Sequence, residues 1–191
     1  MNAAQQTLTT FRHMARFMVG GKIEPGHKPF DDSAILYPKD GFTEADIARL
    51  ATLAGQYRYQ HMVQWARWSA IRTRAGAFTL LPATLVLAGT LGRFGPWHIR
   101  AASTAIAALA LLAAWTARFG NYAFTGCQAE QLAKGSTLEP TVAESALMGK
   151  TVHDTNAAIV ATGDDYTTAV RLFWVAMVLA WAGIAWEGLA G

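Results

Sequence analysis

The chain has 191 residues, of which 52% are hydrophobic and 15% are charged, and its mean hydropathy is +0.19. Soluble domains average about 45–50% apolar and about 25% charged residues, and the apolar excess of this chain is gathered into blocks. These values exclude a disordered chain, a coiled coil and a small disulfide scaffold. The composition indicates a membrane protein.

The charge and cysteine content point the same way. Sixteen Lys and Arg against thirteen Asp and Glu give a net charge of +3, which is too small for a nucleic-acid-binding surface unless the basic residues cluster. They cluster beside the first apolar block, where anionic lipid is the simpler partner. The single cysteine, Cys127, cannot form an internal disulfide. No cleavable signal peptide is evident, so we expect the first membrane span to direct insertion.

Residues 1–42 are predicted to form an amphipathic helix followed by a Pro/Gly-rich loop. Four apolar residues recur at helical spacing: Leu8, Phe11, Ala15 and Met18. Arg12 and Arg16 are expected on the opposite side. Such a stripe suits a helix that lies on a membrane surface, and a groove in a partner protein would fit it as well.

Residues 43–74 are predicted to form a cytoplasmic basic helix. Thr43 can cap its start together with Asp46, and Phe42 and Ile47 are placed as a hydrophobic staple. Four arginines of this helix are expected to hold the lipid or partner surface: Arg58, Arg67, Arg72 and Arg74. The helix could continue directly into the first membrane span.

Three uncharged blocks predict transmembrane helices. Ala75–Gly92 contains 18 residues and Ala101–Ala117 contains 17, and helices of this length nearly match the roughly 30 Å hydrocarbon layer. A short turn joins them, so residues 75–117 are predicted to form a transmembrane hairpin, bent at Pro82. The third block, Leu172–Trp186, has 15 residues. We expect a cytoplasmic helical segment over 118–168 and a third transmembrane helix over 169–191.

Tryptophan and basic residues predict depth and orientation. Four tryptophans flank the second and third blocks as interface anchors: Trp97, Trp115, Trp174 and Trp186. Trp181, in the middle of the third block, is expected to pack against a neighbouring helix. Fourteen Lys and Arg lie before the first block or within 118–171, and two lie in the hairpin turn. The positive-inside rule therefore places the N-terminus in the cytoplasm.

Small residues recur at four-residue intervals in the first span: Thr84, Ala88 and Gly92. Small side chains let helix backbones approach closely in lipid. This spacing predicts helix packing, either within the hairpin or against other membrane subunits.

The candidate chemical motifs are weak. No histidine lies within a predicted span, which argues against a transmembrane haem. Gly149-Lys150-Thr151 lacks the first glycine of a phosphate-binding loop, because Glu144 occupies that position. Asp164-Asp165 is interpreted as a solvated cap of the third helix. We expect no catalytic residue, cofactor, metal, small-molecule substrate or directly bound nucleic acid.

Two segments resemble small inner-membrane components of type IVB (Dot/Icm-like) conjugation and secretion systems: Thr43–Leu50 (TEADIARL) and Ala117–Gln128 (ARFGNYAFTGCQ). The resemblance extends over roughly residues 40–140. It implies an all-α integral protein of a bacterial inner membrane that serves as a non-enzymatic structural part of a machine moving DNA or protein. The alternative is an accessory membrane subunit of a respiratory or other redox enzyme complex.

Overall fold

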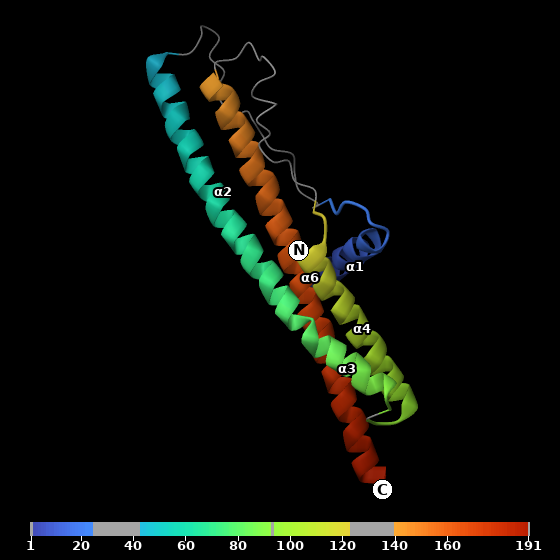
Figure 1. Cartoon of the computed structure of the whole chain (residues 1–191). Helices are drawn as coiled ribbons and strands as arrows, with labels where there is room; N and C mark the ends of the chain where they lie inside the picture. Colours follow the sequence, from blue (N-terminus) through green and yellow to red (C-terminus); the bar gives the residue numbers. More distant parts are fainter. Residues whose placement is uncertain (1, 25–42, 93, 123–139, 191) are drawn as a thin grey trace. The chain divides into compact units, whose positions relative to one another are not determined.

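The structure, a computed structural model, describes residues 2–24, 43–92, 94–122 and 140–190 (Figure 1). Its elements are all α-helices: α1 (Ala3–Met18), α2 (Glu44–Phe78), α3 (Leu80–Thr90), α4 (Trp97–Phe119) and α6 (Pro140–Ala190). The predicted all-α class is confirmed for this part of the chain. Phe42 of the expected staple, and Cys127 with the second half of the resembling segment, lie outside the described residues.

The chain divides into two compact units. Unit 1 comprises Met1–Ile23, Ser69–Asn121 and Ala161–Gly191, and unit 2 comprises Glu24–Trp68 and Tyr122–Val160. Helices α2 and α6 each contribute residues to both units.

In unit 1, α4 packs against α3 on one side and antiparallel to the C-terminal part of α6 on another (Figure 1). As residue numbers rise along α4, the residue numbers of the contacting residues on α6 decrease. Gly95, just before α4, lies so close to Gly183 that an added Cβ would come within 2.8 Å of the Gly183 Cα. The Ser103 hydroxyl donates to the Ala176 carbonyl at 2.8 Å, and Ala114 shares a buried cluster with Ala169.

Pro82 lies just after a break in the predicted first span. Helix α2 ends at Phe78 and α3 begins at Leu80, because Pro82 has no N–H to donate to the Phe78 carbonyl four residues earlier. The expected bend is confirmed. The expected helix over Ala75–Gly92 is therefore divided at this bend between the end of α2 and α3, which has 11 residues and is about 16 Å long by itself.

Helix α6 differs from the predicted division at residues 168 and 169. It continues for 51 residues without a boundary there. Asp164 and Asp165 therefore lie inside a helix, and Asp165 is buried, so the interpretation as a solvated cap is wrong. A cap satisfies backbone N–H groups that a helix start leaves unpaired, and the preceding turns of α6 already occupy that role.

Unit 2 contains the start of α2, where the expected cap is confirmed. The Asp46 N–H donates to the Thr43 hydroxyl at 3.2 Å, and the Thr43 hydroxyl and N–H donate to Asp46 Oδ2 at 2.6 and 3.0 Å. Helices α2 and α6 lie side by side in this unit, where the Ser145 hydroxyl donates to the Leu50 carbonyl at 2.9 Å (Figure 1).

Candidate functional site

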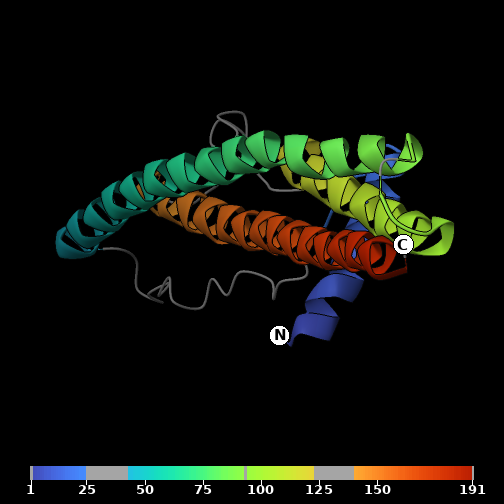
Figure 2. The same ribbon diagram turned by 90° about the horizontal axis from the view of Figure 1, so that it is seen from below.

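Helix α1 lies across α4 and α6 instead of running along them (Figure 2). Its start is fixed by a capping box in which Asn2 and Gln5 exchange hydrogen bonds of 2.9 and 3.2 Å. The side that it turns toward the bundle carries Thr10, His13 and Met14, all buried. Met14 joins the apolar cluster of α4 and α6 alanines, and the two polar residues have partners of their own.

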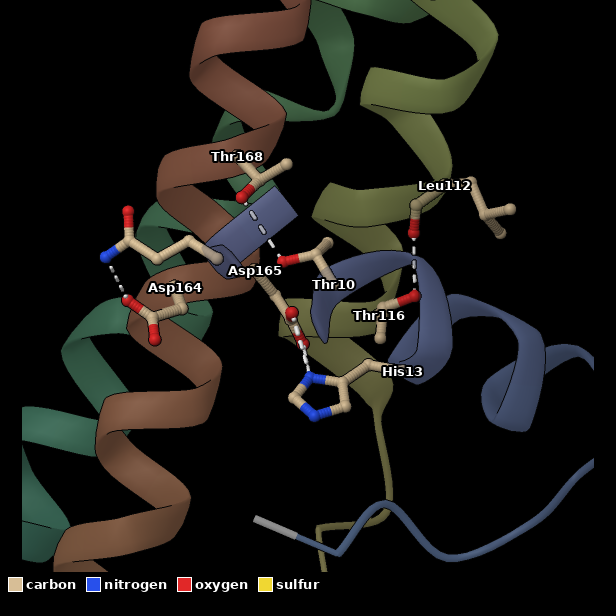
Figure 3. Close-up of polar contacts among 8 residues, drawn as sticks. Thr10, His13, Leu112, Thr116, Asp164, Asp165 and Thr168 are labelled. Carbon is tan, nitrogen blue, oxygen red and sulfur yellow. Dashed lines mark hydrogen bonds and ion pairs between the residues drawn. The ribbon is translucent and has the colours of Figure 1, made fainter. Parts of the chain in front are cut away.

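The centre of this crossing is a buried imidazole–carboxylate pair (Figure 3). His13 Nδ1 lies 3.0 Å from both carboxylate oxygens of Asp165. His13 is 4% exposed and Asp165 is 0% exposed. One helical turn away, the Thr10 and Thr168 hydroxyls are hydrogen-bonded at 3.2 Å. We call these four residues the crossing site.

A bridge at the edge of the crossing site links α1 to the same stretch of α6. The Gln6 amide nitrogen donates to Asp164 at 3.0 Å, and its amide oxygen accepts a hydrogen bond from Arg171 at 2.9 Å. Gln6 thus holds an acidic and a basic group of α6 with one side chain. This bridge and the crossing site fix both the position of α1 along α6 and its rotation about its own axis.

The chemistry of the crossing site is that of attachment. Burial of a charged or polar group is costly unless it is paired, so the pair favours one docked arrangement over sliding of α1. Within the described residues, no group of three or more His, Cys, Asp or Glu is arranged to hold a metal ion.

Sequence reasoning missed the crossing site. It assigned no role to His13 and interpreted Asp165 as part of a solvated cap. The available signal was the three-residue spacing of Thr10 and His13, which puts two polar groups on the helix side opposite the apolar stripe. Their partners on α6 lie more than 150 residues away in the chain.

The apolar stripe of α1 faces outward. Leu8, Phe11 and Met18 are exposed, and so is Val19 beyond the helix end. Arg12 and Arg16 are exposed too, so they border the stripe, and the expectation that they lie opposite to it is wrong. The opposite side is the one that packs on the bundle.

The four arginines singled out on α2 do not share one face. Arg58 and Arg67 are nine positions apart and Arg72 and Arg74 are two apart, separations that place each pair on opposite sides of a helix with 3.6 residues per turn. The Arg72 Nε donates to the Arg118 carbonyl, one of the last carbonyls of α4, which have no partner within their own helix. Arg72 thus caps α4, and a lipid or partner contact of the four arginines stays a prediction.

The anticipated interface tryptophans are all exposed: Trp97, Trp115, Trp174 and Trp186. Their role as depth anchors stays a prediction. Trp181 is 64% exposed, so no described helix of this chain covers it, and its packing against a neighbouring helix of another subunit stays a prediction. It lies on the outward side of α6.

The small residues that bring α3 and α4 together differ from those predicted. Gly89 is buried, and an added Cβ would overlap the Thr104 side chain. Thr84 and Gly92 are exposed and Ala88 is half-buried. The contact face of α3 therefore includes Pro82 and Gly89, and packing through Thr84, Ala88 and Gly92 would require another subunit.

Among the described residues, two helical stretches are long and apolar enough to cross a membrane, judged by length and composition: Trp97–Phe119 and Leu147–Leu189. The described part of the chain is thus all-helical and contains two candidate membrane spans. No known protein family, curated protein or solved structure matches the chain.

Proposed function

We propose that this protein is an integral subunit of a bacterial inner-membrane complex, with a structural and not an enzymatic role. The observation that carries the proposal is the distribution of side chains in unit 1. Most of its buried helix residues are small, among them Ser103, Ala107, Ala110, Ala114, Ala176 and Ala180, and the large apolar side chains buried with them are Met14, Ile23, Phe94 and Phe173. Its outer surface carries large apolar ones: Leu80, Leu87, Leu109, Trp115, Trp174, Val178, Trp181 and Ile184.

Water would disfavour this arrangement. A soluble domain gains stability by burying Leu, Val and Trp and not Ala and Ser. In lipid no such force drives large side chains inward, and small residues allow close helix packing. In each candidate span, 33% of the apolar window is buried inside the chain, which leaves most of it available to lipid.

The lengths support three crossing segments. Helix α4 has 23 residues and is about 34 Å long, and residues 172–189 of α6 cover about 27 Å. The third is the bent segment from Ala75 to Thr90, about 24 Å long, which with α4 would form the proposed transmembrane hairpin. Each length is close to the roughly 30 Å hydrocarbon core.

The basic residues of unit 1 support a cytoplasmic N-terminus. Arg72, Arg74 and Arg118 lie where α2 meets the end of α4, and Arg171 lies where the last apolar segment of α6 begins. Such a concentration at one end of the spans is typical of the cytoplasmic side.

The resemblance of Thr43–Leu50 and Ala117–Gln128 to type IVB components supports a narrower proposal. The complex would be a conjugation or secretion machine, and the partners would be other membrane subunits. Two surfaces are available to contact these partner subunits: the exposed tryptophans, and the side of α3 that carries Thr84, the half-buried Ala88 and Gly92.

Membrane insertion is tested with one matched pair of variants. Val178→Lys places a charge on the outward side of the proposed third span, at a cost of about 2.5–3.5 kcal/mol near the membrane centre. Thr52→Lys adds the same charge to an exposed position of α2 in unit 2. We expect the first variant to lose membrane insertion and the second to retain it. A full chain that stays monodisperse in buffer without detergent would overturn the proposal.

The topology and the complex need separate measurements. Reporters fused after Gly191 and inserted into the turn before Trp97 should both indicate the periplasmic side. Affinity purification of the full chain in mild detergent should recover secretion ATPases. Co-purifying haem or quinone activity would support the accessory redox subunit instead.

A further inference from the structure

We propose that α1 is an in-plane membrane anchor whose outward face binds anionic phospholipid headgroups. The inference rests on the proposed function, because it requires α4 and the last part of α6 to cross a bilayer. It adds a lipid-binding surface, and it commits to one occupant, a membrane with a negative surface charge.

The first argument is the direction of α1. It lies across α4 and α6 (Figure 2), so when these helices stand upright in the bilayer, α1 lies along its plane. A helix of 16 residues in that position is about 24 Å long, long enough to present four turns to the headgroups.

The second argument is the depth of α1. It contacts α6 at Asp165 and Thr168, immediately before the uncharged segment that begins at Leu172. It contacts α4 near Ala113 and Ala114, about one turn from Arg118. Charged groups begin on both helices at this level, as expected at a membrane–water boundary.

The third argument is the face that α1 leaves uncovered. Leu8 is 55% exposed, Met18 66% and Val19 81%. At about 100° per residue, Phe11 and Met18 lie on one border of this face and Arg12 and Arg16 on the other. One border can thus enter the acyl region while the guanidinium groups meet lipid phosphates, the arrangement of interfacial amphipathic helices.

The crossing site holds this face in position. Because His13 and Thr10 point toward Asp165 and Thr168, α1 cannot roll without breaking both contacts. The apolar stripe must therefore remain on the outside, where a bilayer reaches it. Arg12 and Arg16 are attracted to the negative charge of an anionic lipid surface, and a zwitterionic bilayer has no such net charge.

Depth is tested by site-directed spin labelling of the full chain in nanodiscs of equimolar phosphatidylcholine and phosphatidylglycerol. Cys127→Ser removes the single cysteine, and labels are placed by Ala15→Cys, Val178→Cys and Thr52→Cys. The ratio of oxygen to nickel-complex collisions rises with depth in the bilayer. We expect the highest ratio at Val178, the lowest at Thr52 and an intermediate ratio at Ala15.

The three labels separate the two proposals. A water-like ratio at Ala15 together with a lipid-like ratio at Val178 overturns the anchor and leaves the membrane protein intact. Water-like ratios at both positions overturn the proposed function. Spin–spin broadening at Ala15 would show that a second copy covers α1, and it would also overturn the anchor.

The lipid charge is tested by hydrogen exchange of α1 amides in nanodiscs with and without phosphatidylglycerol. Each arginine near an anionic surface is worth about fivefold in binding, so phosphatidylglycerol should slow α1 exchange by roughly 25-fold. In the double variant Arg12→Gln and Arg16→Gln, the slowing should fall below about twofold. Equal slowing in the variant and the parent chain would overturn the recognition of anionic headgroups.

Discussion

The crossing site provides the sharpest test of how α1 is attached. His13→Ala removes the imidazole that lies 3.0 Å from both Asp165 oxygens and leaves the carboxylate in a buried position. Removing a hydrogen-bond partner of a buried carboxylate typically costs about 3 kcal/mol. Undocking of α1 would relieve that cost by admitting water to Asp165, so the loss should appear as opening of α1 and not as global unfolding.

The assay is amide hydrogen exchange of the full chain in a neutral detergent. A loss of about 3 kcal/mol corresponds to a more than hundredfold increase in the opening equilibrium, so amides of α1 should exchange about a hundredfold faster. Amides of α4 should change little, because its contact with α6 through Ser103 remains. Arg12→Ala is the matched control, since Arg12 is exposed on the same helix.

A double variant separates the pair from simple loss of packing. When both His13 and Asp165 become Leu, the imidazole and the carboxylate are removed together, and replacing a buried pair by apolar residues is often nearly neutral. Exchange of α1 should then return to within about tenfold of the parent chain. Unchanged exchange in His13→Ala, or strictly additive effects of the two single leucine variants, would refute the reasoning.

Other features of the fold make further predictions. Gly95→Ala should destabilise the chain by about 2–4 kcal/mol in detergent unfolding, because its φ is +62° and a Cβ would lie 2.8 Å from Gly183 Cα. Gly163→Ala, a helical position with open space, should be neutral or stabilising by up to about 1 kcal/mol; equal losses in both would contradict the packing. Hydrogen bonds from the Thr43 hydroxyl and N–H lower the pKa of Asp46 from 3.8. The cap therefore stabilises the start of α2 above pH 3.8 and is lost as the pH falls through the lowered pKa. Exchange of the first α2 turn should accelerate over that range in the parent chain, and Asp46→Asn should remove this pH dependence. Exchange that accelerates equally in both chains would exclude Asp46 as the titrating group.

Two arginines of α2 allow a direct test of the cap on α4. Arg72→Gln should loosen the end of α4, because it removes the donor to the Arg118 carbonyl. Arg74→Gln should leave the exchange of α4 amides unchanged. Equal effects of the two substitutions would contradict the assignment of Arg72 as a helix cap.

Local patterns in the sequence were sufficient for the helical class, the cap at Thr43 and the bend at Pro82. Each depends on groups a few residues apart: a side chain that reaches the third residue of its own helix, or a ring that lacks one N–H. The apolar blocks likewise predicted the two candidate spans, Trp97–Phe119 and the C-terminal part of α6, because helix length and bilayer thickness are fixed quantities.

The tertiary structure alone decided which side of each helix is covered. Arg12 and Arg16 border the outward stripe because His13 and Thr10 find partners on α6, and Trp181 faces outward because Ala176 and Ala180 occupy the inner side. The periodicity along one helix predicts that its two faces differ, but which face is buried depends on groups far away in the chain. Asp165 shows this most clearly, since a buried carboxylate in the middle of α6 is paired with an imidazole from α1, more than 150 residues away in the chain.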